Sequence, residues 1–131
     1  MTTLAPAPDQ AVAADRYLAD RVMTAGPAEL TAMLFDACVA STKLAIRLQE
    51  SGDFIAALPK LTKAQSIVLE LRSTLNHEAG KLASNLDALY TYAWTKLFRA
   101  GTHRDTAAAR EALTVIEPLQ KAWRETFTSA A

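Results

Sequence analysis

Two histidines and a single cysteine are the residues of this 131-residue chain best suited to nucleophilic or metal chemistry. Neither His77 nor His103 belongs to a Glu-x-x-His pair, which excludes a carboxylate-bridged di-iron bundle by ligand count. Cys38 has no partner nearby in the sequence for zinc. It falls on an apolar helical face, where a thiol usually acts as a small hydrophobic side chain. We therefore expect no metal site and no nucleophilic cysteine.

Other signatures of catalysis are also missing from the sequence. There is no glycine-rich phosphate loop, and Asp20, Asp36 and Asp87 fall on separate predicted elements, so they suggest no acid–base pair. One alternative stays open, because His77-Glu-Ala-Gly-Lys81 faintly resembles the site of histidine phosphotransfer bundles. Against it, His77 is expected at the end of its helix rather than in the middle. We predict a protein that is not an enzyme and needs no cofactor.

Composition narrows the possible partners. Half of the residues are apolar and 21% are charged, which is enough apolar material for a packed core. The formal net charge is zero and neither half of the chain is basic, so nucleic acid is not expected as a partner. No stretch reaches the roughly 18 apolar residues of a membrane span. With one cysteine and no secretion signal, we expect a cytoplasmic protein that does not insert into membranes.

The elements that must position any site are predicted to be helices with short connections. Gly26-Pro27, Ser51-Gly52-Asp53, Gly80 and Gly101 interrupt the helical pattern. The expected fold class is all-α, an antiparallel up-down four-helix bundle with an additional short N-terminal helix. Residues 1–14 are expected to be a flexible tail, and residues 15–131 the helical-bundle domain. Within that domain helices are predicted at about 15–24, 27–50, 54–77, 82–100 and 105–127.

The helix at 27–50 carries two apolar stripes, and they leave two interpretations open. The face predicted to be core holds Leu30, Met33, Leu34, Ala37, Cys38, Leu44, Ala45 and Leu48. Beside it lies a second stripe of Phe35, Val39 and Ile46. Both stripes belong to the core if the helix packs against two neighbours. Alternatively, the second stripe lines a groove for an apolar partner, because a small bundle has difficulty burying wide apolar arcs on several helices at once.

The helix at 82–100 is dense in aromatic residues. Its predicted core side holds Leu82, Leu86, Leu89, Ala93 and Leu97, and four aromatics lie within residues 90–98: Tyr90, Tyr92, Trp94 and Phe98. An aromatic stripe at helical spacing is usually core, but Tyr and Trp also suit a surface that binds apolar peptide. In the last helix, Leu119 and Trp123 are expected on the inward face.

Three stretches, in order along the chain, together resemble the FliS-type flagellar export chaperones, which bind flagellin. They contain Tyr17, Val22-Met-Thr-Ala-Gly-Pro27 and Met33-Leu-Phe-Asp36; then Leu82-Ala-Ser-Asn85-Leu86, Leu89-Tyr90 and Tyr92; then Ala100, Asp105 and Ala122-Trp123. The chain departs from the family pattern at Ala37, Lys81 and Gly101, and at two prolines inside predicted helices, Pro59 and Pro118. We expect a bend at Pro118, and at Pro59 either a bend or the start of the regular helix.

This resemblance implies a bundle that holds the disordered C-terminal segment of flagellin in the cytoplasm, prevents its premature polymerisation and delivers it to the flagellar export gate. An N-terminal segment with its Tyr can cover part of the client surface. Asn85 is expected on the inward arc, bonding either the client or its own chain. A third interpretation is a scaffold or homodimer whose stripes pair with a second copy. The residues predicted to form the flagellin-binding groove are Tyr17, Val22, Leu34, Phe35, Val39, Ile46, Asn85, Leu86, Leu89, Tyr90, Trp94 and Phe98.

Overall fold

The computed structural model describes Arg16 and residues 26–130, with side chains described as far as Thr126. The predicted tail and most of the predicted short helix at 15–24 lie outside these residues. Four long helices make up the described part: α2 (Pro27–Glu50), α3 (Phe54–Ser73), α4 (Lys81–Thr102) and α5 (Thr106–Ala130), with a short 3-10 turn, η1 (His77–Ala79), before α4.

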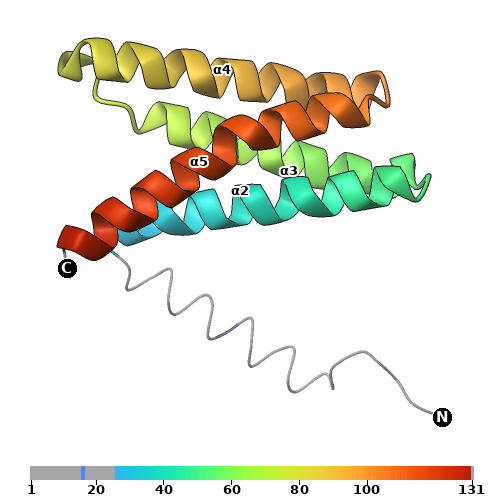
Figure 1. Cartoon of the computed structure of the whole chain (residues 1–131), viewed down its shortest axis with the longest axis horizontal. Helices are drawn as coiled ribbons and strands as arrows, with labels where there is room; N and C mark the ends of the chain where they lie inside the picture. Colours follow the sequence, from blue (N-terminus) through green and yellow to red (C-terminus); the bar gives the residue numbers. More distant parts are fainter. Residues whose placement is uncertain (1–15, 17–25, 131) are drawn as a thin grey trace.

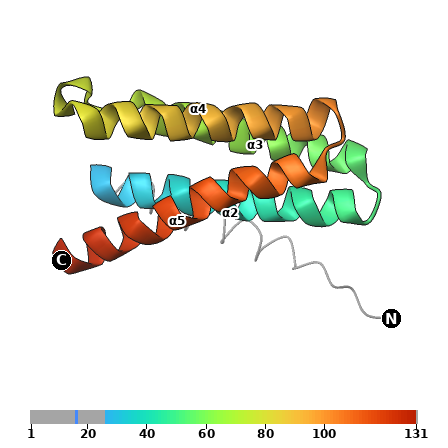
Figure 2. The ribbon, with the colours of Figure 1, turned by 45° about the horizontal axis from the view of Figure 1, so that its top comes forward.

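The four helices form an antiparallel up-down bundle (Figure 1). Each of α2 and α4 packs against both α3 and α5, so the helices follow one another around a common core. Figure 2 shows the same arrangement after rotation, with α4 above α3 and α5 crossing obliquely in front of α2. The predicted all-α class and up-down bundle are confirmed.

Local capping explains where the helices begin. Pro27 is the first residue of α2, where its missing N–H group leaves no hydrogen bond unmade. The Asp53 side chain accepts a hydrogen bond from the Ala56 backbone N–H at 3.2 Å and caps α3. Asp105 does the same for α5 by accepting from Ala108 N at 3.1 Å.

Two predicted helix ends need correction. The helix expected to reach 77 ends at Ser73, and His77 instead begins η1, which the Asn76 side chain caps by accepting from Glu78 N at 3.0 Å. At its other end, α4 continues through Gly101 to Thr102. A Cβ atom on Gly101 would lie 3.3 Å from Leu58 Cδ2, so this glycine permits close packing against α3 rather than ending the helix.

The core decides between the two interpretations of α2. Phe35, Val39 and Ile46, the predicted second stripe, are at most 8% exposed and belong to the main hydrophobic cluster, as the interpretation with both stripes in the core expected. Leu34 and Leu48, taken from the predicted core face, are only partly buried. Because α2 packs against two neighbours, the buried arc is centred between them and not on the most continuous run of leucines.

The three polar side chains buried in α2 each donate a hydrogen bond to a backbone carbonyl. Ser41 Oγ donates to the Lys60 carbonyl at 2.8 Å, and Gln49 Nε2 donates to the Ala100 carbonyl at 2.9 Å. Thr42 Oγ1 donates to the Cys38 carbonyl at 2.8 Å. The bonds of Ser41 and Gln49 tie α2 to α3 and α4, whereas that of Thr42 stays within α2.

Candidate binding groove at one end of the bundle

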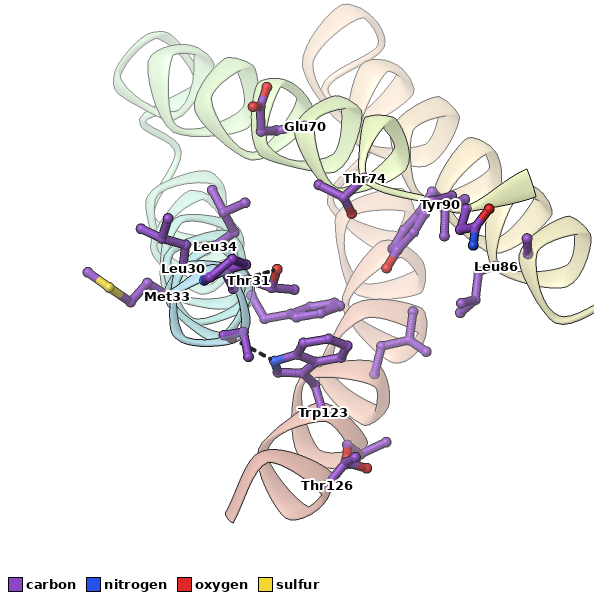
Figure 3. Close-up of a pocket in the computed structure, with 18 of the residues that line it drawn as sticks. Leu30, Thr31, Met33, Leu34, Glu70, Thr74, Leu86, Tyr90, Trp123 and Thr126 are labelled. Atoms are coloured by element: carbon purple, nitrogen blue, oxygen red, sulfur yellow. Dashed lines mark hydrogen bonds between the residues drawn. The ribbon is translucent and has the colours of Figure 1, made fainter. Parts of the chain in front are cut away.

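An open groove of about 1250 Å³ lies at the end of the bundle where α2 and α4 begin and where α3 and α5 end (Figure 3). All four helices and η1 contribute to its walls. The apolar side chains that line it include Leu30, Met33, Leu34, Leu75, Leu82, Leu86 and Leu119. A hollow of this size and apolar character is typical of a binding site.

Three aromatic rings from three helices form one continuous cluster in the groove. The centroid of the Phe35 ring of α2 is 6.5 Å from that of Tyr90 on α4 and 6.3 Å from that of Trp123 on α5. Trp123 Nε1 also donates a hydrogen bond to the Ala28 carbonyl at 3.2 Å, which ties the end of α5 to the start of α2. The rings therefore join the walls of the groove across the bundle end.

Few of the side chains that line the groove are polar. Among the described residues that line it, Glu70 alone carries a formal charge. Figure 3 shows Glu70 of α3 and Thr126 of α5 at opposite margins, with the leucines and aromatic rings between them. An apolar hollow with a polar rim is suited to an apolar or amphipathic partner.

The titrating groups buried at or beside the groove stay neutral near neutral pH. Burial raises the pKa of Tyr90 to about 12 and, deeper in the core, the pKa of Cys38 to about 12. Neither group is poised to exchange protons. Among the described residues no three His, Cys, Asp or Glu side chains gather as metal ligands would. What the groove offers is apolar contact area.

The structure brings four of the predicted site residues together in this groove: Leu34 and Phe35 from α2, and Leu86 and Tyr90 from α4. Val39 and Ile46 are buried in the core, so the expectation that they present an accessible stripe is wrong. The reason is the packing of α2 against two helices described above.

Asn85 and Leu89 lie on α4 but outside the groove. Asn85 is exposed, so the expectation that its amide faces inward is wrong. The buried residues of α4 are Ala83, Tyr90, Ala93, Leu97 and Ala100. Asn85 follows Ala83 by two positions, which places it about 200° around the helix and away from the buried face. Leu89 is 39% exposed and does not line the groove.

Trp94 and Phe98 lie on the side of the bundle formed by α3 and α4. Their rings pack edge to face with centroids 5.5 Å apart, and Phe98 is 40% exposed. Trp94 lines a smaller cavity of about 310 Å³ with Leu69 and Tyr90. Tyr17 and Val22 fall outside the described residues, and their predicted contact with a client stays a prediction.

Sequence reasoning missed several residues of the groove, above all Leu30, Met33 and Trp123, which were assigned to the bundle interior. Their position in the chain was the available signal. They lie in the first turns of one helix and the last turns of another, so in an up-down bundle they meet at the same end. At that end an inward-facing side chain lacks a full set of opposing neighbours.

None of the described helices combines the length and apolar character needed to cross a bilayer. The family model described as "Flagellar protein FliS" matches residues 10–130. The chain is 33% identical to the flagellar secretion chaperone FliS of Bacillus subtilis (strain 168) over 113 residues, which cover 86% of this chain and 84% of that protein.

The flagellar secretion chaperone FliS of Salmonella typhimurium (strain LT2) is 32% identical over 112 residues, covering 84% of this chain and 83% of that protein. A solved structure described as a flagellar chaperone from bacteria superimposes with a TM-score of 0.69 and covers 93% of this chain and 99% of that chain. Its sequence identity is 22%, so this last similarity supports the fold alone.

Proposed function

This chain belongs to the FliS family of flagellar secretion chaperones, and we propose that it binds the C-terminal segment of flagellin in the apolar groove at the end of the bundle. The observation that carries the proposal is the groove itself. Its walls hold exposed or half-buried leucines that a soluble protein normally covers, and its interior has almost no charge. A disordered segment with an apolar face is the kind of partner that suits such a surface.

Binding in this groove combines burial of apolar area with ordering of the client. Leucines from α2 and α4 and the ring of Trp123 supply apolar surface on several sides of the occupant. A disordered segment that folds on binding buries about 1,000–3,000 Å² and loses about 2–5 kcal/mol of the gross interaction energy to ordering. We infer that the client lies in the groove as an amphipathic helix with its apolar side toward Phe35 and Leu86.

The biological consequence is that bound flagellin is withdrawn from the free pool in the cytoplasm. Mass action alone then keeps it from polymerising early, with no nucleotide required. The complex is the form delivered to the flagellar export gate. In this proposal the segment around Tyr17 and Val22 covers part of the client surface, as the family resemblance implies.

The phosphotransfer alternative gains no observation in its favour. His77 is exposed in η1, a turn of three residues at the end of the bundle, and does not stand on a long helix face. The scaffold or homodimer interpretation becomes an outcome of the binding experiment, because a second copy would compete for the same leucines.

The test is calorimetric titration of the full chain with a synthetic peptide of the flagellin C-terminal segment. We expect binding by the wild-type protein, and an affinity about tenfold weaker for Leu34→Ser and for Leu86→Ser, because each loses part of the transfer free energy of a buried leucine. Ile55→Ser is the matched control, because Ile55 is 77% exposed on α3 and outside the groove.

The proposal fails if the wild-type protein does not bind the peptide. It also fails if both groove variants bind as tightly as Ile55→Ser. Circular dichroism of each variant, recorded before titration, establishes that the helices are retained, so that a lost affinity reports on the groove.

A further inference from the structure

The hydroxyl of Tyr90 is a polar group inside an otherwise apolar part of the groove. Tyr90 is 5% exposed and its ring packs against Phe35. Figure 3 shows its hydroxyl pointing into the space between α2 and α5. The contact between the two rings does not require this oxygen, because a phenylalanine ring could make it as well.

This hydroxyl makes no hydrogen bond within the described part of the chain, in contrast to other polar aromatic groups nearby. Trp123 Nε1 donates to the Ala28 carbonyl at 3.2 Å, and Tyr92 Oη donates to Glu111 Oε2 at 3.5 Å. Among the described residues the only fully enclosed side-chain oxygen or nitrogen without a partner is Gln49 Oε1. The Tyr90 oxygen is thus unpaired but open to the groove.

A segment bound in the groove would change which hydrogen-bond partners this hydroxyl can reach. In the empty groove water can serve as its partner, but an apolar segment laid over it would exclude that water. A buried hydroxyl left without a partner costs about 1–3 kcal/mol, whereas a hydrogen bond from the occupant would remove that penalty. The hydroxyl is protonated at neutral pH, as in an ordinary tyrosine, and burial raises the pKa of Tyr90 further, to about 12.

We propose that Tyr90 donates a hydrogen bond to an uncharged carbonyl oxygen of the segment that occupies the groove, and thereby sets the register of that segment. This inference rests on the proposed function. A carboxylate would be a poor acceptor here, because the surrounding side chains are apolar and a buried unpaired charge is strongly unfavourable.

Two parts of the client can supply such a carbonyl. One is the side-chain amide of Asn or Gln on the face of the helix that covers Tyr90. The other is a backbone carbonyl in the last turn of a client helix, where the carbonyls have no intrahelical partner. Carbonyls in the middle of a helix are already bonded. A client that places neither kind of carbonyl opposite Tyr90 would leave the tyrosine unpaired and would bind more weakly.

The decisive variant is Tyr90→Phe, with Tyr92→Phe as the matched control. Both remove one phenolic hydroxyl, but Tyr92 is 43% exposed and lies outside the groove. We expect Tyr90→Phe to keep or raise the urea midpoint of the free protein, since no internal hydrogen bond is lost. Its affinity for the flagellin C-terminal peptide should fall by about three- to tenfold, and that of Tyr92→Phe should not change.

Equal or tighter peptide binding by Tyr90→Phe overturns the inference. This outcome is separable from failure of the proposed function. If the wild-type protein binds and Leu86→Ser weakens binding while Tyr90→Phe does not, only the role of Tyr90 is rejected. If the wild-type protein does not bind, both are rejected.

A double-mutant cycle identifies the source of the carbonyl. Each Asn or Gln of the peptide is replaced by Leu in turn, and backbone esters, whose carbonyls are weaker acceptors, are placed along the peptide. A change that weakens binding to wild type but not to Tyr90→Phe marks the acceptor as side chain or backbone. The absence of coupling at every position overturns the inference.

Discussion

Cys38 of α2 is fully buried against α3, and its Sγ lies 3.7 Å from the Ala64 carbonyl oxygen. Burial is the larger influence on its acidity and raises the pKa to about 12, although a hydrogen bond with Thr42 acts in the opposite direction. The thiolate is the reactive form of cysteine. The environment of this residue therefore suppresses the chemistry that its type could perform.

We predict that native protein resists alkylation at Cys38. With a pKa of about 12, about one thiol in ten thousand is ionised near pH 8, and burial also blocks access. Mass spectrometry after exposure to iodoacetamide should find no adduct on the native chain and complete labelling in denaturant. Rapid labelling under native conditions would contradict the prediction.

Asn85 illustrates what the pattern of single residues could and could not predict. Its position between apolar neighbours suggested an inward amide, but it is exposed. The helical wheel gives the angle between two residues correctly. Which direction on the wheel faces the core depends on where the neighbouring helices lie. A residue near the edge of an apolar arc is therefore the hardest to place from sequence.

At the scale of elements, a proline inside α5 affects the direction of this helix and therefore the shape of the groove. Pro118 is exposed in the middle of this helix and precedes Leu119, which lines the groove. Proline removes one backbone hydrogen bond and favours a bend. In Figure 1 the C-terminal half of α5 turns away from α4 and runs beside α2, on the groove side of this proline.

We predict that Pro118→Ala stabilises the free protein and weakens peptide binding. Restoring a backbone N–H in an exposed helix interior should raise the free energy of unfolding by about 1–3 kcal/mol. A straighter α5 would bring its last turns toward α4 and narrow the groove. Urea unfolding and calorimetric titration measure the two effects.

Pro59→Ala is the control for this prediction, because Pro59 is also exposed inside a helix, α3, and lies outside the groove. It should raise stability without changing the affinity for the peptide. If Pro118→Ala and Pro59→Ala leave the affinity equally unchanged, Pro118 has no part in shaping the groove.

At the scale of the whole molecule, two buried groups make stability depend on alkaline pH. The pKa of Cys38 rises from 9.0 to about 12 on folding, and that of Tyr90 from 10.0 to about 12. The folded state thus holds both protons more tightly than the unfolded chain. Their stabilising contribution is complete below about pH 9 and is lost as the pH rises toward 12.

We therefore predict that the urea midpoint falls steadily between about pH 9 and pH 12. Cys38→Ala removes one of the two groups, so its midpoint, although lower at neutral pH because a buried atom is lost, should fall less steeply above about pH 9. An identical slope for wild type and Cys38→Ala would refute the assignment of this titration to Cys38.

Much of the fold was open to sequence reasoning because its causes are local. Pro27, Asp53 and Asp105 mark helix starts through backbone geometry and capping that depend on a few adjacent residues. Short connections between four such helices favour an up-down bundle. The ends at Ser73 and Thr102 were harder to predict, because Gly101 serves packing against Leu58 and Asn76 starts a separate turn.

The groove depends on contacts between residues far apart in the chain, and this is why it was only half anticipated. From the sequence, the wide apolar arcs were compatible either with a core that uses both stripes or with a groove for a partner. The positions of α3 and α5 beside α2 decide which apolar residues are buried. Val39 lies in the buried arc between them, whereas Leu34 is only partly buried. Whether a side chain is buried depends on the residues packed around it. Phe35, Tyr90 and Trp123 are far apart in the sequence and come into contact only in the folded chain.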